Sequence, residues 1–220
     1  WDSSNYAIAQ SSVAGFMKKF PNAKTFFSIT MDYAWGTDMY KEAKAVVEKL
    51  GGKMIGNVLT PMKESDYSGA ITKALSAKPD VIMLNLYGAP LIKSARAVAE
   101  FGAKERAKIL IPADGLTMLR GIGSEALQGM YVGSHWWHTA DNEFSRNFVK
   151  NFQKKYGVIP SYFAAACYVG ATQTIQAMER CGSTDVDKVI CALEGHQYDG
   201  PTGKETIRAF DHQVTHPFLL

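Results

Sequence analysis

Cysteine is scarce in this sequence, and the three that are present are not arranged to bind a metal. The 220 residues contain no CxxC pair and no Cys/His cluster with metal-ligand spacing. We therefore expect no metal site. The spacing leaves two alternatives open: a disulfide between Cys181 and Cys191 with Cys167 left over, or three small buried apolar side chains.

Long apolar runs and runs of a single charge are also missing. The longest apolar stretch, VIMLNLYGAPLI, is well below the roughly 18–20 residues that a membrane-spanning helix needs. The net charge is +3, and the basic runs are no longer than pairs such as Lys18-Lys19. Positive charge this diffuse offers no stripe along which phosphates could bind, so we do not expect a nucleic-acid partner.

The motifs of common α/β enzymes are absent as well. Neither GxGxxG nor GxxxxGK[ST] follows the first predicted strand, and no GxSxG turn occurs, so we predict no cofactor and no catalytic residues. His135 and His138 are three apart on a predicted strand and would point to opposite faces, which disfavours a metal pair. The alternative is an enzyme of flavodoxin-like or Rossmann-like topology, which would need a catalytic set that the sequence does not offer.

The sequence does contain a regular alternation of strand and helix between residues 22 and 137. Apolar runs rich in β-formers are separated by helical patterns of about 10–15 residues, which indicates βαβ units. Right-handed crossovers then give an α/β fold with a parallel, doubly wound sheet. The predicted strands are 25–30, 53–60, 81–86, 107–114 and 129–137, and the main predicted helices begin at about 37, 65 and 90.

After residue 137 the pattern changes to helices without strands between them. The predicted helices are 143–156, 162–180 and 185–193, and strand character returns only near residue 199. Their apolar stripes, such as Phe144, Phe148 and Phe152, need a surface to cover them. We expect that surface to be a sheet outside these 220 residues. The alternative is that the helices fold back on the one predicted sheet as a single compact domain.

Aromatic residues follow the predicted strands where surface turns are expected. Tyr33 and Trp35 follow the first strand, Tyr87 the third, and Asp114 the fourth. Ligands bind outside the carboxyl ends of parallel strands, so we predict that these four residues line a site for a small, partly apolar ligand with a cationic or hydroxyl group.

Each of these residues also has a purely structural alternative. The aromatic rings could cover the core of their own domain, and Asp114 could cap the helical turn at 116–120. The pair Trp136-Trp137 falls on the predicted strand 129–137, where neighbours point to opposite faces. We predict that Trp136 faces the ligand and Trp137 the packing behind it.

Several segments, taken in order, resemble a known family. They are DYAWG, ESDYSGAITKALSAKPDVIML, RAVAEFGAK, IPADG, GMYVG, YGVIPSYFAAACYVGA and YDGPTGKETIRAFD. The series is similar to the solute-binding proteins of branched-chain amino-acid-type ABC importers, which are type I periplasmic binding proteins. The resemblance implies two α/β lobes joined by three crossing strands, and it implies that this chain is a fragment lacking most of the first lobe. It assigns 6–132 and 203–220 to the second lobe, 138–200 to helices of the first, and 133–137 and 198–203 to crossings.

The resemblance also implies roles for individual residues and for the protein. Trp35 matches an aromatic that closes over the ligand, Tyr87 a tyrosine of the cleft, and Asp114 an acid that receives an ammonium in amino-acid-binding relatives. The implied function is extracytoplasmic binding of an amino acid, or of an aromatic or aliphatic acid or amide, for delivery to membrane permease subunits. The implied location is the periplasm or the outer face of the membrane, and the full-length protein is expected to be monomeric. The alternative is a ligand-sensing regulator or receptor domain of the same fold.

Overall fold

A computed structural model describes residues 4–220. The chain divides into two compact units, one formed by residues 4–134 with 218–220 and the other by residues 135–217. We call them the α/β unit and the helical unit. Residues 203–217 thus belong to the helical unit, and their assignment to the second lobe with 6–132 is wrong. The reason is that β7 (Gly203–Ile207) of this segment pairs with residues 197–200, and β8 (Val214–Thr215) pairs with β7.

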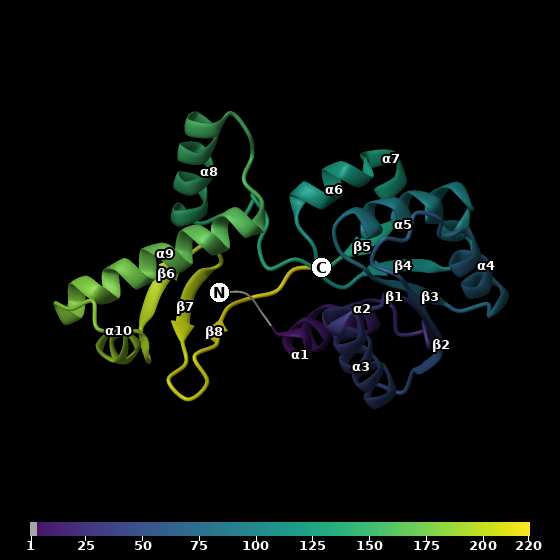
Figure 1. Cartoon of the computed structure of the whole chain (residues 1–220), viewed down its shortest axis with the longest axis horizontal. Coiled ribbons are helices and arrows are strands. Elements are labelled where there is room, and N and C mark those ends of the chain that lie inside the picture. Colours follow the sequence, from purple (N-terminus) through teal and green to yellow (C-terminus); the bar gives the residue numbers. More distant parts are fainter. Residues whose placement is uncertain (1–3) are drawn as a thin grey trace. The chain divides into compact units, whose positions relative to one another are not determined.

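The α/β unit is built on a five-stranded parallel sheet of order β2-β1-β3-β4-β5, whose strands are labelled in Figure 1. The register pairs Phe26 of β1 with Val81 of β3, and Val81 with Lys108 of β4. This confirms the predicted α/β fold with a parallel sheet. The strands are β1 (Thr25–Met31), β2 (Lys53–Thr60), β3 (Val81–Asn85), β4 (Lys108–Ile111) and β5 (Met130–Val132).

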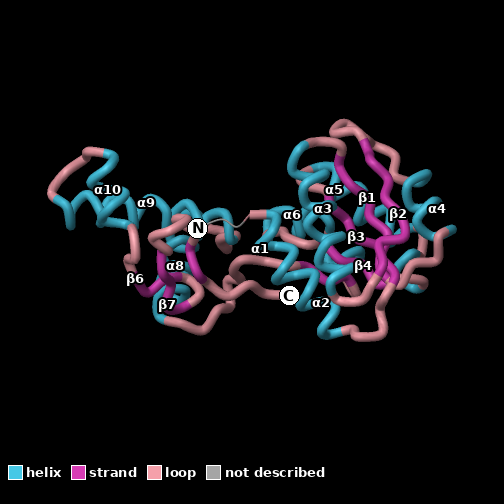
Figure 2. The backbone as a smooth tube through the Cα atoms, turned by 90° about the horizontal axis from the view of Figure 1, so that it is seen from below, coloured by secondary structure: helices cyan, strands magenta, loops and turns pink. Residues whose placement is uncertain are grey.

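Helices cover both faces of this sheet, whose strands are magenta in Figure 2. Strand β1 is buried at every residue after its first, because its two faces alternate between two cores. Ile29 belongs to the core under α4 and α5, and Phe26 to the core under α2 and α3. The helices are α1 (Asn5–Ile8), η1 (Ala9–Val13), α2 (Ala14–Lys19), α3 (Ala34–Lys49), α4 (Ser68–Ser76), α5 (Ala89–Glu100), η2 (Ala103–Glu105), α6 (Leu116–Ile122) and α7 (Ser124–Leu127).

The helical unit contains three longer helices and a three-stranded antiparallel sheet. Asn142 caps the start of α8 and Asp185 the start of α10 through their side chains, while Gly157 and Gly182 end α8 and α9 in the left-handed conformation. The predicted helices are therefore confirmed. The elements are α8 (Glu143–Tyr156), α9 (Tyr162–Cys181), α10 (Val186–Leu193), β6 (Gln197–Gly200), β7 (Gly203–Ile207) and β8 (Val214–Thr215).

Much of the apolar surface of these helices is open within the described residues. The buried core cluster of the helical unit is small, with Trp136, Phe148, Tyr162 and Ala165, and Val169, Ala177, Val189 and Ile207 are buried outside it. Further apolar side chains are at least half exposed: Tyr156, Val158, Tyr168, Ile175 and Val186. The sheet expected to cover them remains a prediction.

The three cysteines carry free thiols, so of the two alternatives the Cys181–Cys191 disulfide is not formed. The alternative of three buried side chains also fails, because Cys167 and Cys191 are exposed. Among the described residues, no helix has the length and apolarity required to span a membrane.

Candidate functional site

The carboxyl ends of three adjacent parallel strands bring the predicted site residues to one edge of the sheet. β1, β3 and β4 are neighbours in the sheet, so the loops after Met31, Asn85 and Ile111 leave from the same edge. The first loop carries Tyr33 and the second Tyr87.

The three predicted aromatics form a continuous chain of rings. The ring centroid of Trp35 lies 6.3 Å from that of Tyr33 and 6.4 Å from that of Tyr87, at interplanar angles of 30° and 58°. These are the distances and tilts of favourable aromatic contacts. Trp35 also packs against the core under α3, yet it keeps part of its surface exposed, and Tyr87 is 38% exposed. The rings therefore present a partly open apolar surface while resting on the core.

Trp35 is held in place by the way α3 begins. The helix starts at Ala34, earlier than predicted, so Trp35 lies in its first turn. A Cβ atom on Gly36 would come within 2.1 Å of the backbone oxygen of Met31, so only glycine lets the helix begin this close to the end of β1. Asn5 adds a hydrogen bond of 3.3 Å from Nδ2 to the carbonyl oxygen of Trp35.

Asp114 lies in the loop after β4, the strand next to β3, and it is fully buried. Its Oδ1 accepts a hydrogen bond of 2.6 Å from the backbone N–H of Gly115, and its Oδ2 has no partner among residues 4–220. Burial raises the pKa of Asp114 to about 7, against the smaller lowering effect of the Gly115 bond. The cap position of α6 is Gly115, without a side-chain cap bond, so the alternative role of Asp114 as the cap of this helix is not realised.

Trp136 does not join this group, and the prediction that it faces the ligand is wrong. The strand predicted over 129–137 ends at Val132, so the alternation of faces used for Trp136 and Trp137 does not apply there. Trp136 is 1% exposed in the core of the helical unit, and its Nε1 donates a hydrogen bond of 2.9 Å to Ser145 Oγ. A buried indole N–H needs such an acceptor, and here it has one.

A buried chain of polar side chains at the same edge was not predicted from the sequence. Asn85 Nδ2 donates to Ser28 Oγ at 2.9 Å, Ser28 and Thr30 share a hydrogen bond of 2.7 Å, and Thr30 Oγ1 donates to Asn57 Oδ1 at 2.7 Å. The chain crosses β3, β1 and β2. The available signal was the presence of polar residues inside strands that are otherwise continuously apolar.

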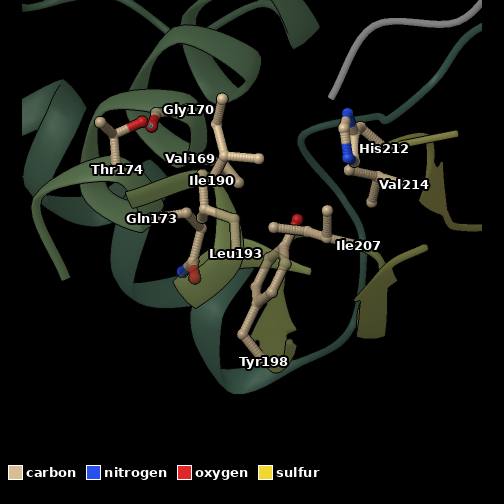
Figure 3. A pocket seen from close by; sticks show the side chains of 10 residues that line it. All are labelled: Val169, Gly170, Gln173, Thr174, Ile190, Leu193, Tyr198, Ile207, His212 and Val214. Atoms are coloured by element: carbon tan, nitrogen blue, oxygen red, sulfur yellow. Dashed lines mark hydrogen bonds between the residues drawn. The ribbon is translucent and has the colours of Figure 1, made fainter. Parts of the chain in front are cut away.

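The helical unit has a separate cavity of about 240 Å³ between α9, α10 and its small sheet. Figure 3 shows its aliphatic walls with the ring of Tyr198 and the amide of Gln173 among them. None of the five predicted site residues lines this cavity. Within residues 4–220, no group of three or more His, Cys, Asp or Glu side chains could hold a metal ion.

Comparisons with known proteins agree on one family. A family model described as periplasmic binding protein matches residues 1–220. The curated Leu/Ile/Val-binding protein homolog 4 of Brucella abortus is 24% identical over 99% of this chain and 53% of its own length. The chain thus spans about half the length of the curated relatives it matches.

The solved structures that are similar in fold to this chain include the following two. The amino acid ABC transporter substrate-binding protein of Pseudomonas fluorescens Pf-5 matches with a TM-score of 0.95 and 36% identity, over 99% of this chain and 59% of that one. A solute-binding protein of a Rhodopseudomonas palustris ABC transporter, solved with 3,4-dihydroxybenzoic acid, has a TM-score of 0.84 and 23% identity over 96% of this chain and 59% of its own. The second likeness concerns the fold alone.

Proposed function

Because the chain belongs to the periplasmic binding protein family, we propose that it binds a small organic solute outside the cytoplasm for delivery to an ABC importer. The solute is an amino acid, or an aromatic or aliphatic acid or amide. The named relatives are solute-binding proteins rather than enzymes, in keeping with a binding role.

The observation that carries this proposal is the chain of three aromatic rings at the carboxyl edge of a parallel sheet. Tyr33 and Tyr87 come from two adjacent loops and Trp35 from the first turn of α3, and all three keep part of their surface open. Such a surface suits a flat or branched apolar body, which gains from burial against the rings. Asp114, in the loop after the next strand of the sheet, adds an acceptor for a polar group of the solute. Apolar walls with few polar anchors are typical of small-molecule sites.

The rest of the transport role follows from this proposal. The chain spans about half of its curated relatives, so the residues described here supply one side of the site, and further residues of the whole protein supply the other. Binding between two lobes selects a closed arrangement from a hinge equilibrium, and the closed form is the one offered to the permease subunits. We place the protein in the periplasm or at the outer face of the membrane, as a monomer when full length.

Calorimetric titration of the full-length protein tests the proposal. The panel is L-leucine, L-threonine, benzamide and 3,4-dihydroxybenzoate, and we expect saturable binding of at least one member. Trp35→Ala should weaken that binding by about 1–3 kcal/mol, because a stacked ring loses both contact area and shape.

Tyr40→Ala is the matched control for this variant. Tyr40 lies on the same helix and packs against the same core, but it is five residues further from the edge. It should lower stability without changing affinity. Equal losses of affinity in the two variants, or no heat with any member of the panel, would contradict the proposal.

A further inference from the structure

Asn85 is a buried amide at the last position of β3, two residues before Tyr87. Every other residue of this strand is apolar and buried. An amide in such a place needs hydrogen bonds to offset the loss of water. Only its nitrogen has one, to Ser28.

With the Asn57 amide oriented so that its Oδ1 faces Thr30, the protons of this hydrogen-bonded series have one consistent arrangement. Thr30 has a single hydroxyl hydrogen, which it donates to Asn57 Oδ1, so Ser28 must donate to Thr30. Ser28 Oγ is then left as an acceptor, and the group that donates to it must be the Nδ2 of Asn85. The amide of Asn85 is thereby fixed in orientation, and its Oδ1 points away from Ser28.

Two buried acceptor oxygens at this edge have no partner among the described residues: Oδ1 of Asn85 and Oδ2 of Asp114. Asn85 ends β3, and Asp114 follows the adjacent strand β4, which pairs with β3 up to Met83 and Leu110. If the strands continued in this register, Asp114 would lie two residues beyond the position opposite Asn85. A rise of about 3.3 Å per residue and a strand spacing of about 4.8 Å then separate the two Cα atoms by roughly 8 Å. An unpaired buried acceptor destabilises a fold, and two at one edge point to a donor from outside the unit.

We propose that Asn85 is a specificity-determining residue of the ligand site, whose Oδ1 accepts a hydrogen bond from an N–H or O–H group of the solute beside Asp114. This inference rests on the proposed function. It narrows the solute to one whose end carries at least two donor hydrogens, such as a primary ammonium, a primary amide or two neighbouring hydroxyls. Both oxygens are buried, so the contact requires the residues that cover them to move.

The two acceptors differ in how they respond to pH. Asp114 changes protonation near neutrality, since burial raises its pKa to about 7. Asn85 has no charge to gain or lose in this range. Its contribution to selectivity should therefore be the same at pH 6 and pH 8, whereas that of Asp114 should change.

The test measures how strongly the full-length protein prefers solutes that carry the N–H or O–H donor group over analogues that lack it. The pairs are L-leucine with 4-methylpentanoate, benzamide with acetophenone, and 3,4-dihydroxybenzoate with benzoate, titrated by calorimetry at pH 6 and pH 8. The pair that is discriminated also tells whether the donor group is charged or neutral. We expect a preference of tenfold or more in one pair, reduced about tenfold in Asn85→Leu at both pH values.

Asn57→Ala is the matched control, because it removes an amide at the opposite end of the same hydrogen-bonded chain. It should lower stability but leave the preference unchanged. Asn85→Asp keeps an acceptor at the same place and should retain the preference, so a loss in this variant refutes the role of Asn85 even if Asn85→Leu does not fold.

The outcomes separate the inference from the proposed function. If the unmodified protein binds a pair without preference, if the preference survives in Asn85→Leu, or if it is lost in Asn85→Asp, the role of Asn85 is refuted while solute binding stands. An equal loss of preference in Asn57→Ala would also refute the role of Asn85. The hydrogen-bonded side chains would then affect binding only through the stability of the fold. If no member of any pair binds, the proposed function fails and the inference falls with it.

Discussion

The buried carboxyl of Asp114 should make the stability of the protein depend on pH in an unusual direction. Most carboxyl groups are at least as acidic in the folded state as in the unfolded chain, so their contribution to stability is lost on acidification. Asp114 is the opposite case. Its Oδ2 has no partner in the described part of the chain, and burial favours the protonated form. We therefore expect this residue to stabilise the folded protein more at acidic than at neutral pH.

The size of the effect follows from the difference between the two pKa values. The pKa is 3.8 in the reference state and about 7 in the folded protein, so between these values the folded state holds a proton that the unfolded state has lost. Stability then falls by about 1.4 kcal/mol per pH unit across this window, because the unfolded state binds fewer protons. Over roughly three units the total is on the order of 4 kcal/mol. The contribution is fully present below pH 3.8 and is lost as the pH rises towards 7.

Asp114→Asn isolates this contribution, since the amide keeps the shape of the side chain but does not titrate. The measurement is the urea dependence of unfolding at pH 4.5, 6 and 8, for the variant and the unmodified protein. We expect the variant to gain stability relative to the unmodified protein as the pH rises, by several kcal/mol between pH 4.5 and pH 8. The difference between the two proteins cancels the titration of all other groups.

A difference that stays constant between pH 4.5 and pH 8 would refute the reasoning. It would mean that the carboxyl group is hydrated or paired in solution and titrates as in the unfolded chain. Asp66→Asn serves as a control, because Asp66 is exposed and its pKa is lowered by hydrogen bonds with Ser68. The difference in stability between Asp66→Asn and the unmodified protein should therefore change with pH in the opposite direction.

Two further substitutions test the packing that positions the site. Gly36→Ala should destabilise the α/β unit by about 1–3 kcal/mol in urea unfolding, because the new methyl group meets the Met31 carbonyl, whereas Gly170→Ala, with open space around it, should be neutral or stabilising. A neutral Gly36→Ala would contradict the close contact. Trp136→Phe should cost about 1–3 kcal/mol by removing the indole N–H bonded to Ser145, with no change in solute affinity by calorimetry; a loss of affinity at unchanged stability would return Trp136 to the ligand site.

The α/β unit could be predicted from the sequence because its strands are buried on both faces. A stretch such as VIMLN, with helical patterns before and after it, is readily assigned as a buried strand. Once the strands are assigned, the parallel topology predicts which loops meet at the carboxyl edge of the sheet. This was enough to bring Tyr33, Trp35 and Tyr87 to one place. It was not enough for Trp136, because a strand boundary misplaced by five residues invalidates any argument from alternation.

The polar chain could not be predicted for a different reason. Ser28 and Thr30 are common strand residues, and nothing local indicates that their hydroxyl groups connect Asn85 to Asn57 across three strands. The fixed orientation of the Asn85 amide is a property of the whole network. Likewise, the burial of Asp114 depends on residues that are distant in the sequence. The sequence alone was therefore compatible with both roles of Asp114, as a helix cap and as a residue of the ligand site.

The contact between Trp35 and its two tyrosine neighbours gives the site an optical signature. Light absorbed by Tyr33 or Tyr87 passes efficiently to an indole whose ring centre is only 6.3 or 6.4 Å away. Trp136, in contrast, is shielded in the other unit and bonded to Ser145, so its emission should not change when the surroundings of the sheet edge change. A solute that settles on the rings would alter the polarity around Trp35 and the geometry of energy transfer at the same time. The protein therefore carries an intrinsic fluorescent reporter at the place where binding is proposed, and solutes can be screened without attaching a dye.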